Sequence, residues 1–309
     1  MSESSAIRYR VEHRTTYAYQ GRNDLCHSLA HLRPLENSTQ RIVSQELNIS
    51  PEPAYHSRRN DYFGNAVDYF SVETSHEALS VLSDVVVEKF PTQGTQISDM
   101  SVGTWNGEPP PLPKTDDTGI RLSDFLIGSR ACPLIAEARE FVRPHLIPGT
   151  KLTEIAGGVM SQVYRDFAYT PGATDVLTPL KDVAGTRKGV CQDFAHFMIA
   201  GLRSVGIPAR YVSGYLETIP PPGTKKLRGA DASHAWVEVW MPGAGWVGFD
   251  PTNDKQPGNQ HIKLAHGRDY FDVQPLRGIF IGSGSQALSV EVDVTRFDKE
   301  GEKATAGRL

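Results

Sequence analysis

Three residues of the sequence, Cys191, His234 and Asp250, have the types and the chain order expected for nucleophilic chemistry by a thiol. Cys191 opens an apolar segment that predicts a helix from about Val190 to Val205. The N-terminus of a helix carries unpaired N–H groups and a partial positive charge, and both favour a thiolate. The alternative is a small core residue, because free cysteine is among the most buried residue types.

A thiolate enzyme also needs a base, and His234 is the best placed of the ten histidines. It opens the segment SHAWVEVW, whose aromatic and β-branched residues predict a strand after a polar loop. A histidine at the start of a strand can face a helix N-terminus across a cleft. His196 is nearer to Cys191 in sequence, but the helical rotation turns it to another face, so we expect a packed or surface residue there.

Asp250 follows the next predicted strand and is the candidate to orient the histidine. If the hairpin formed by the two strands is centred on Gly243, Asp250 lies opposite Trp236 and on the same face as His234. An even register would place the two side chains on opposite faces, so the hypothesis requires an odd register or a bulge. Glu238 shares the face of His234 and is a rival. An ordinary turn residue is the other interpretation of Asp250.

The segments that must position these residues predict two folded units. Residues 6–90 alternate apolar and polar residues between turn signals, which is typical of an antiparallel β-sandwich-like domain. After a Pro- and Gly-rich stretch, the chain shows helical periodicity and then alternating strands. The predicted fold class is α+β. The predicted units are an N-terminal β domain (1–92), a linker (93–119), a catalytic core (120–275), and C-terminal strands with a tail (276–309) that join either unit.

The sequence resembles the transglutaminase-like superfamily, which shares a papain-like Cys-His-Asp arrangement. The resemblance is carried by GVCQDFAHFMIAGLRSVGIPARYVSGY, by DASHAWVEVWMPGAGWVGFDPTN and by FAYTPG before them. DYFGNAVDYFSVETSHEALSV and GRDYFDVQPLRGIFIGSG are similar to bacterial members with an N-terminal β region. The resemblance implies a papain-like core with Cys191 as nucleophile, His234 as base and then acid, and Asp250 as orienting residue.

The implied reaction is acyl transfer or hydrolysis at an amide or isopeptide bond of a peptide or protein, through a thioester on Cys191. Tyr169 is the candidate for a second oxyanion donor, because transglutaminases proper use an upstream tryptophan that this segment lacks. Gln192 and Trp236 are predicted to line the substrate cleft. Gln192 is not assigned to the oxyanion site, because papain-like proteases place their glutamine before the cysteine. Protein crosslinking by transamidation and a catalytically silent interaction module are the alternatives.

Composition narrows the possible partners. A formal net charge of −4 with scattered basic residues predicts no nucleic-acid partner, and no signal-peptide core or membrane-spanning run is present, which predicts a cytoplasmic protein. No cofactor is expected. Cys26, His27 and His31 lie close in sequence but among predicted strands, so no metal is assigned to them. His261 and His266 are expected at the surface. The basic loop residues Lys225, Lys226 and Arg228 suggest either a solvated loop or a flap that steers an anionic substrate.

Overall fold

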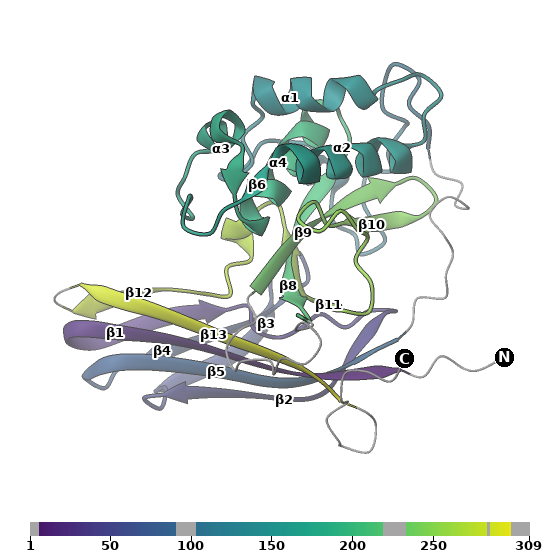
Figure 1. Cartoon of the computed structure of the whole chain (residues 1–309). Helices are drawn as coiled ribbons and strands as arrows, with labels where there is room; N and C mark the ends of the chain where they lie inside the picture. The colour runs from purple at the N-terminus through teal and green to yellow at the C-terminus, as the bar shows by residue number, and fades with distance from the viewer. Residues whose placement is uncertain (1–5, 91–102, 219–232, 283–284, 298–309) are drawn as a thin grey trace, which may run out of the picture.

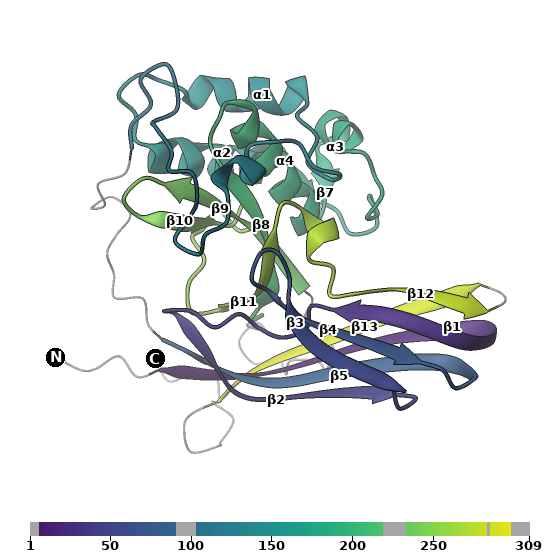
Figure 2. The same cartoon turned by 180° about the vertical axis from the view of Figure 1, so that it is seen from behind.

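The computed structural model describes residues 6–90, 103–218, 233–282 and 285–297. They form two modules, and Figures 1 and 2 show one as a broad β platform and the other as a compact α/β unit resting on it. The β-module is an antiparallel sheet built from both ends of the chain. Its strands are β1 (Ile7–Ala30), β2 (Gln40–Ser50), β3 (Tyr55–Asn60), β4 (Ala66–Val72), β5 (His76–Lys89), β12 (Leu276–Gly282) and β13 (Gln286–Phe297).

The long strand β1 takes part in two layers of the β-module. Its first half pairs with β5 and β13, and its second half pairs with β4 and β12. A buried cluster joins the layers, since Leu79 and Val81 of β5 pack with Cys26 of β1 and Phe70 of β4. The predicted antiparallel β-sandwich-like region is therefore confirmed. The C-terminal strands, whose partner the sequence left open, belong to it.

Among the described residues, the α/β module contains four α-helices and a four-stranded antiparallel sheet of order β10-β9-β8-β11. Helix α4 packs on β8 and β9, α2 also contacts β9, and α1 packs on the outer side of α4 (Figure 1). The elements are η2 (Leu122–Phe125), α1 (Ala136–Val142), η3 (Arg143–His145), α2 (Leu152–Asp166), β6 (Ala168–Tyr169), α3 (Leu180–Thr186), β7 (Lys188–Gly189), α4 (Cys191–Ser204), β8 (Ala209–Leu216), β9 (Ser233–Met241), β10 (Gly245–Phe249), β11 (His261–Gly267) and η4 (Tyr270–Asp272).

The segment predicted as a linker is part of the α/β module from residue 103 onward. Trp105 is buried in the main hydrophobic cluster, and its backbone N–H donates to Thr150 O at 2.9 Å. Asp116 accepts a hydrogen bond from the Trp246 indole at 3.0 Å. The Pro- and Gly-rich segment is extended and packs against the fold. A free linker can have the same composition, so composition alone does not distinguish the two. The predicted boundary at residue 119 is therefore wrong for 103–119, and residues 93–102 lie outside the described chain.

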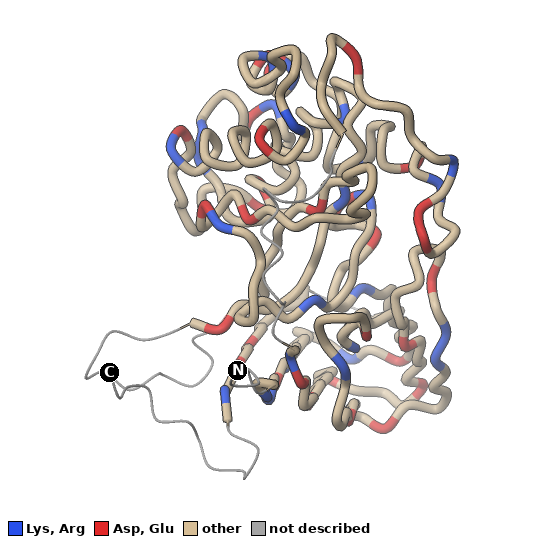
Figure 3. Tube along the Cα trace, turned by 90° about the vertical axis from the view of Figure 1, so that its right-hand side faces the viewer, with Lys and Arg blue, Asp and Glu red and all other residues tan. Residues whose placement is uncertain are grey.

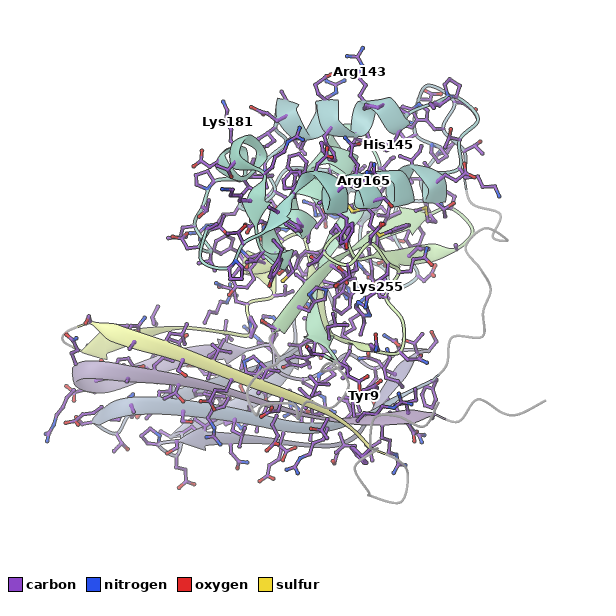
Figure 4. All side chains as sticks on the ribbon, in the orientation of Figure 1. Tyr9, Arg143, His145, Arg165, Lys181 and Lys255 are labelled. Atoms are coloured by element: carbon purple, nitrogen blue, oxygen red, sulfur yellow. The ribbon has the colours of Figure 1, made fainter. Side chains whose placement is uncertain are left out.

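An apolar and hydrogen-bonded interface joins the modules. Tyr9 and Val11 of β1 pack against Tyr215 of β8 and Ile262 of β11. The Tyr9 hydroxyl donates to Glu217 Oε2 at 3.0 Å, and Figure 4 labels Tyr9 where β1 passes beneath the α/β module. His13 Nδ1 and the Tyr215 hydroxyl are 2.9 Å apart. The β-module thus fixes the end of β8, the strand that pairs with the start of β9.

The surface carries charges of both signs. Basic and acidic residues are interspersed along the traces of both modules in Figure 3. Among the described helices, none combines the length and the hydropathy that a membrane span requires. The basic residues Lys225, Lys226 and Arg228, predicted to belong to either a solvated loop or a substrate-steering flap, lie outside the described residues.

Candidate active site

Cys191 is the first residue of α4, and its side chain is partly exposed, whereas Cys26 and Cys132 are buried. Asp193 closes the first turn, because its Oδ2 accepts the Val190 N–H at 2.8 Å. A Cβ on Gly189 would lie 2.5 Å from the same oxygen, so glycine is required for this close approach. The thiol is therefore held at the exposed, positive end of a helix whose remaining turns are buried.

His234 and Asp250 meet because the β9–β10 hairpin has the register on which the sequence argument depended. Gly245 pairs with Met241 and Phe249 with Val237, which centres the hairpin on Gly243. His234 Nε2 donates to Asp250 Oδ2 at 2.8 Å. The other ring nitrogen, Nδ1, is then the one left for the hydrogen bond between His234 and the Cys191 side chain. The structure thus brings the three predicted residues together in the order thiol, imidazole, carboxylate.

The surroundings of His234 and Asp250 favour the charged form of each side chain. Burial alone would lower the pKa of His234, but hydrogen bonds to Asp250 and Cys191 outweigh it and raise this pKa to about 9. Burial would raise the pKa of Asp250, yet hydrogen bonds from His234, His261 and Asn253 hold it well below its ordinary range. At neutral pH the pair is therefore imidazolium and carboxylate.

The structure adds partners of Asp250 that the sequence analysis missed. His261 Nε2 lies 3.0 Å from Asp250 Oδ2, and Asn253 Nδ2 donates to the same oxygen at 2.8 Å. The Thr252 N–H donates to Oδ1 at 3.0 Å. His261 was predicted at the surface and is in fact buried, as is His266. His261 lies outside the β9–β10 hairpin, because β11 is two strands away from β9 across β8, and the pattern of the hairpin alone therefore does not indicate it.

Trp236 is buried and packs against the rings of His234 and His261, so it does not line a cleft. Its side chain is 2% exposed, which contradicts the predicted substrate contact. Its indole meets the His261 ring edge to face at 5.3 Å and the His234 ring at 6.1 Å, between centroids. Gly214 of β8 makes room for the indole, since a Cβ there would lie 2.5 Å from Trp236 Cη2. The indole therefore holds two imidazoles that belong to different strands.

Tyr169 and Gln192 flank the nucleophile. Parallel pairing of β6 with β7 sets Tyr169 beside Gly189, and the Tyr169 side chain is 56% exposed. Burial and the charge of Cys191 raise the pKa of Tyr169, which keeps its hydroxyl protonated as a donor. Gln192, next to Cys191 in the first turn of α4, is partly exposed. Both remain predicted contacts for a substrate.

The other polar candidates have structural partners. Glu238 is paired with Arg210 at 2.7 Å and with Lys263 at 2.7 Å, so it is engaged away from His234. His196 lies on a buried turn of α4, where its Nε2 accepts the Tyr270 N–H at 3.2 Å.

The histidines considered for metal binding are also occupied. His27 Nδ1 lies 2.8 Å from the Tyr69 hydroxyl, and His31 lies 3.1 Å from Gln274 O. In the described chain, the ligand atoms of His234, Asp250 and His261 lie within 4.8 Å of one another, a set of types that zinc accepts. These same atoms are hydrogen-bonded to each other.

Comparisons with known proteins agree with this architecture. The family model described as the bacterial transglutaminase-like N-terminal region matches residues 9–88, and that of the transglutaminase-like superfamily matches residues 138–251. An uncharacterized protein of Mycobacterium tuberculosis is 38% identical over 302 residues, covering 96% of this chain and 95% of that protein. A protein-glutamine gamma-glutamyltransferase of Pseudomonas aeruginosa is 40% identical over 97 residues, covering 30% of this chain and 14% of that protein.

A solved structure shares the whole fold. The crystal structure of a "Putative Cysteine Protease" from Cytophaga hutchinsonii has a TM-score of 0.73 at 21% identity and covers 97% of this chain and 94% of that chain. Both modules are therefore found together in another protein. With two family models matched in chain order and a relative aligned almost end to end, this chain belongs to the transglutaminase-like superfamily.

Proposed function

We propose that this protein is a thiol-dependent enzyme that hydrolyses or transfers acyl groups at amide or isopeptide bonds of peptides or proteins. The observation that carries the proposal is the convergence of three side chains: the Cys191 thiol at a helix N-terminus, the His234 imidazole hydrogen-bonded to it, and Asp250 behind the imidazole at 2.8 Å. Membership of the superfamily and a relative named as a glutamyltransferase support the same class of reaction.

In the first half of the proposed reaction, the Cys191 thiolate attacks the amide carbonyl carbon and a C–S bond forms. The negative charge passes to the carbonyl oxygen, where the backbone N–H of Cys191 at the open end of α4 is the first donor. Tyr169 is the candidate for the second donor. The bond to nitrogen then breaks as protonated His234 gives its proton to the leaving amine, and a thioester remains on Cys191.

In the second half, neutral His234 takes a proton from water or from an incoming amine, and this nucleophile attacks the thioester. The C–S bond breaks, the acyl group leaves as a carboxylic acid or a new amide, and the thiolate–imidazolium pair is restored. Asp250 keeps the ring of His234 oriented through both halves. Water gives hydrolysis and an amine gives transamidation, and the two outcomes share every protein group named here.

The transamidase is the second candidate, favoured by the glutamyltransferase name of the Pseudomonas relative. Ammonia release from glutamine-containing peptides, measured with and without a primary amine, separates the two candidates. Hydrolysis gives ammonia and a free acid with or without the amine. Transamidation releases ammonia only when the amine is present, and it gives an amine adduct that mass spectrometry detects.

The test of the proposal as a whole is Cys191→Ala. We expect activity on amide substrates to fall to background, because the variant has no nucleophile. Cys26→Ala is the matched control, since Cys26 is buried in the β-module and should be dispensable for turnover. Full activity of Cys191→Ala would refute the mechanism.

A further inference from the structure

We infer that His261 is a positioning residue of this site: a neutral hydrogen-bond donor that holds Asp250 in place and limits how strongly this carboxylate retains the proton on His234. The inference rests on the proposed function, within which it gives a fourth side chain a defined task. Its basis is the shared acceptor, because His234 and His261 both reach Oδ2 of Asp250, at 2.8 and 3.0 Å.

The hydrogen bonds of His261 fix its tautomer. The backbone N–H of Gly258 donates to His261 Nδ1 at 3.2 Å. A backbone N–H can only donate, so Nδ1 carries the lone pair. In the neutral ring the proton then lies on Nε2, which faces Asp250 Oδ2. His261 therefore meets the carboxylate as an N–H donor.

The surroundings of His261 keep it neutral. Its side chain is buried, and burial lowers its pKa, with a smaller lowering from the charges of His234 and Lys255. Asp250 acts in the opposite direction. Lys255, labelled in Figure 4, lies on the loop between β10 and β11 that also carries Asn253. The indole of Trp236, which packs against the His261 ring, is uncharged. His234 is thus the imidazole of the pair that carries the charge.

A neutral donor on the shared oxygen has a specific electrostatic effect. The positive end of the His261 N–H dipole points at Oδ2 of Asp250, on which the His234 imidazolium also converges. This dipole therefore disfavours the positive charge on His234. The Asp250 carboxylate gains a hydrogen-bond donor without gaining a second positive charge nearby. Its stabilisation of the protonated form of His234 is therefore weaker than it would be without His261. Proton transfer is most efficient when the pKa of the catalytic group lies near the working pH. His261 therefore keeps His234 able to release its proton to a leaving amine.

The same geometry argues against zinc as the purpose of this cluster. To bind a metal shared with Asp250, His261 would need a lone pair on Nε2, the nitrogen that faces Asp250, but the N–H of Gly258 places the lone pair of His261 on Nδ1. Zinc binding would require a change of tautomer and the loss of the hydrogen bonds to Asp250 from His234 and His261.

The test uses the full-length protein and the rate at which iodoacetamide alkylates Cys191 as a function of pH. This readout needs no substrate, and its upper inflection reports the loss of the proton from His234. The variants are His261→Leu, which removes the donor, His261→Gln, whose amide can replace it, and Gly258→Pro, which removes the N–H that fixes the tautomer from an exposed loop. His266→Leu is the matched control, a buried histidine on the same strand that is outside the described contacts of Asp250.

We expect His261→Leu to move the upper inflection to higher pH by about one unit and to slow amide turnover about tenfold. Gly258→Pro should move it in the same direction by less, and His261→Gln and the control should match the wild type. If His261→Leu does not fold, Gly258→Pro and His261→Gln carry the comparison.

Wild-type profiles for both His261→Leu and Gly258→Pro would overturn the inference, and so would tight zinc binding that disappears in His261→Gln. Absence of amide turnover in the wild type, with the alkylation shifts present, would instead contradict the proposed function alone.

Discussion

Replacing Asp250 by Asn tests how much of the reactivity of Cys191 depends on a buried carboxylate. The substitution keeps the size of the side chain but removes the charge that faces His234 Nε2 at 2.8 Å. The pKa of His234 is about 9, against an ordinary value of 6.5. Returning it to the ordinary value costs the imidazolium about 3 kcal/mol, at 1.36 kcal/mol for each pKa unit. Burial of the ring lowers it further once the carboxylate charge is gone.

The expected result is a loss of the thiolate–imidazolium pair near neutral pH. A change of about 3 kcal/mol shifts the equilibrium toward thiol and neutral imidazole by about 100-fold. The alkylation rate at Cys191 near pH 7 should therefore fall, at most by this factor. Peptide mapping after brief iodoacetamide treatment measures the rate at Cys191. Cys26 and Cys132 serve as internal references, because burial raises the pKa of both and that of Cys132 to about 12.

Thermal unfolding of the Asp250→Asn variant sets the temperature range in which folded proteins are compared. An alkylation profile that overlays the wild type between about pH 6 and 9, in folded protein, would show that the carboxylate does not sustain the ion pair and would refute the reasoning.

Three further substitutions separate neighbouring roles. Glu238→Gln removes the carboxylate that pairs with the buried side chains of Arg210 and Lys263, so the free energy of unfolding in chemical denaturation should fall by about 3 kcal/mol. Cys191 alkylation in the folded protein should stay unchanged, and a changed alkylation profile would indicate that Glu238 orients His234. Gly214→Ala should destabilise by about 1–3 kcal/mol and slow alkylation, whereas Gly185→Ala, with open space around its Cβ, should do neither; equal behaviour of both would contradict the packing argument. Tyr169→Phe should reduce turnover about 100-fold with unchanged alkylation, and unchanged turnover would exclude it as an oxyanion donor.

The sequence predicted most of the secondary structure around the site, because local periodicity determines it. The helix expected from about Val190 to Val205 is observed as α4, Cys191–Ser204, and the odd register of the β9–β10 hairpin is observed as well. Such features depend on residues near each other in the chain. The linker boundary failed for the opposite reason, since burial of Trp105 depends on residues far along the chain that its own segment does not show.

The site was predictable where its residues share a hairpin and hidden where they do not. His234 and Asp250 lie on neighbouring strands, so the parity of their positions decides whether they face one another. His261 reaches Asp250 from a strand beyond β8, and it packs against the indole of Trp236, for which Gly214 leaves space. A signal was nevertheless present, because His261, like His234, opens a strand after a stretch of mostly polar residues in the sequence.

The partners of β1 have a consequence for how the protein matures. β1 is translated before the α/β module, yet β12 and β13, which flank it on one side, follow that module in the chain. That flank stays open until β12 and β13 have been translated, and a long unpaired edge is a hazard for misassociation. The α/β module is thereby an insertion between strands of one sheet. A chain that ends before residue 276 would lack β12 and β13, and the β-module would be incomplete. Ribosome-arrested chains should therefore remain protease-sensitive in β1 until the last strands emerge.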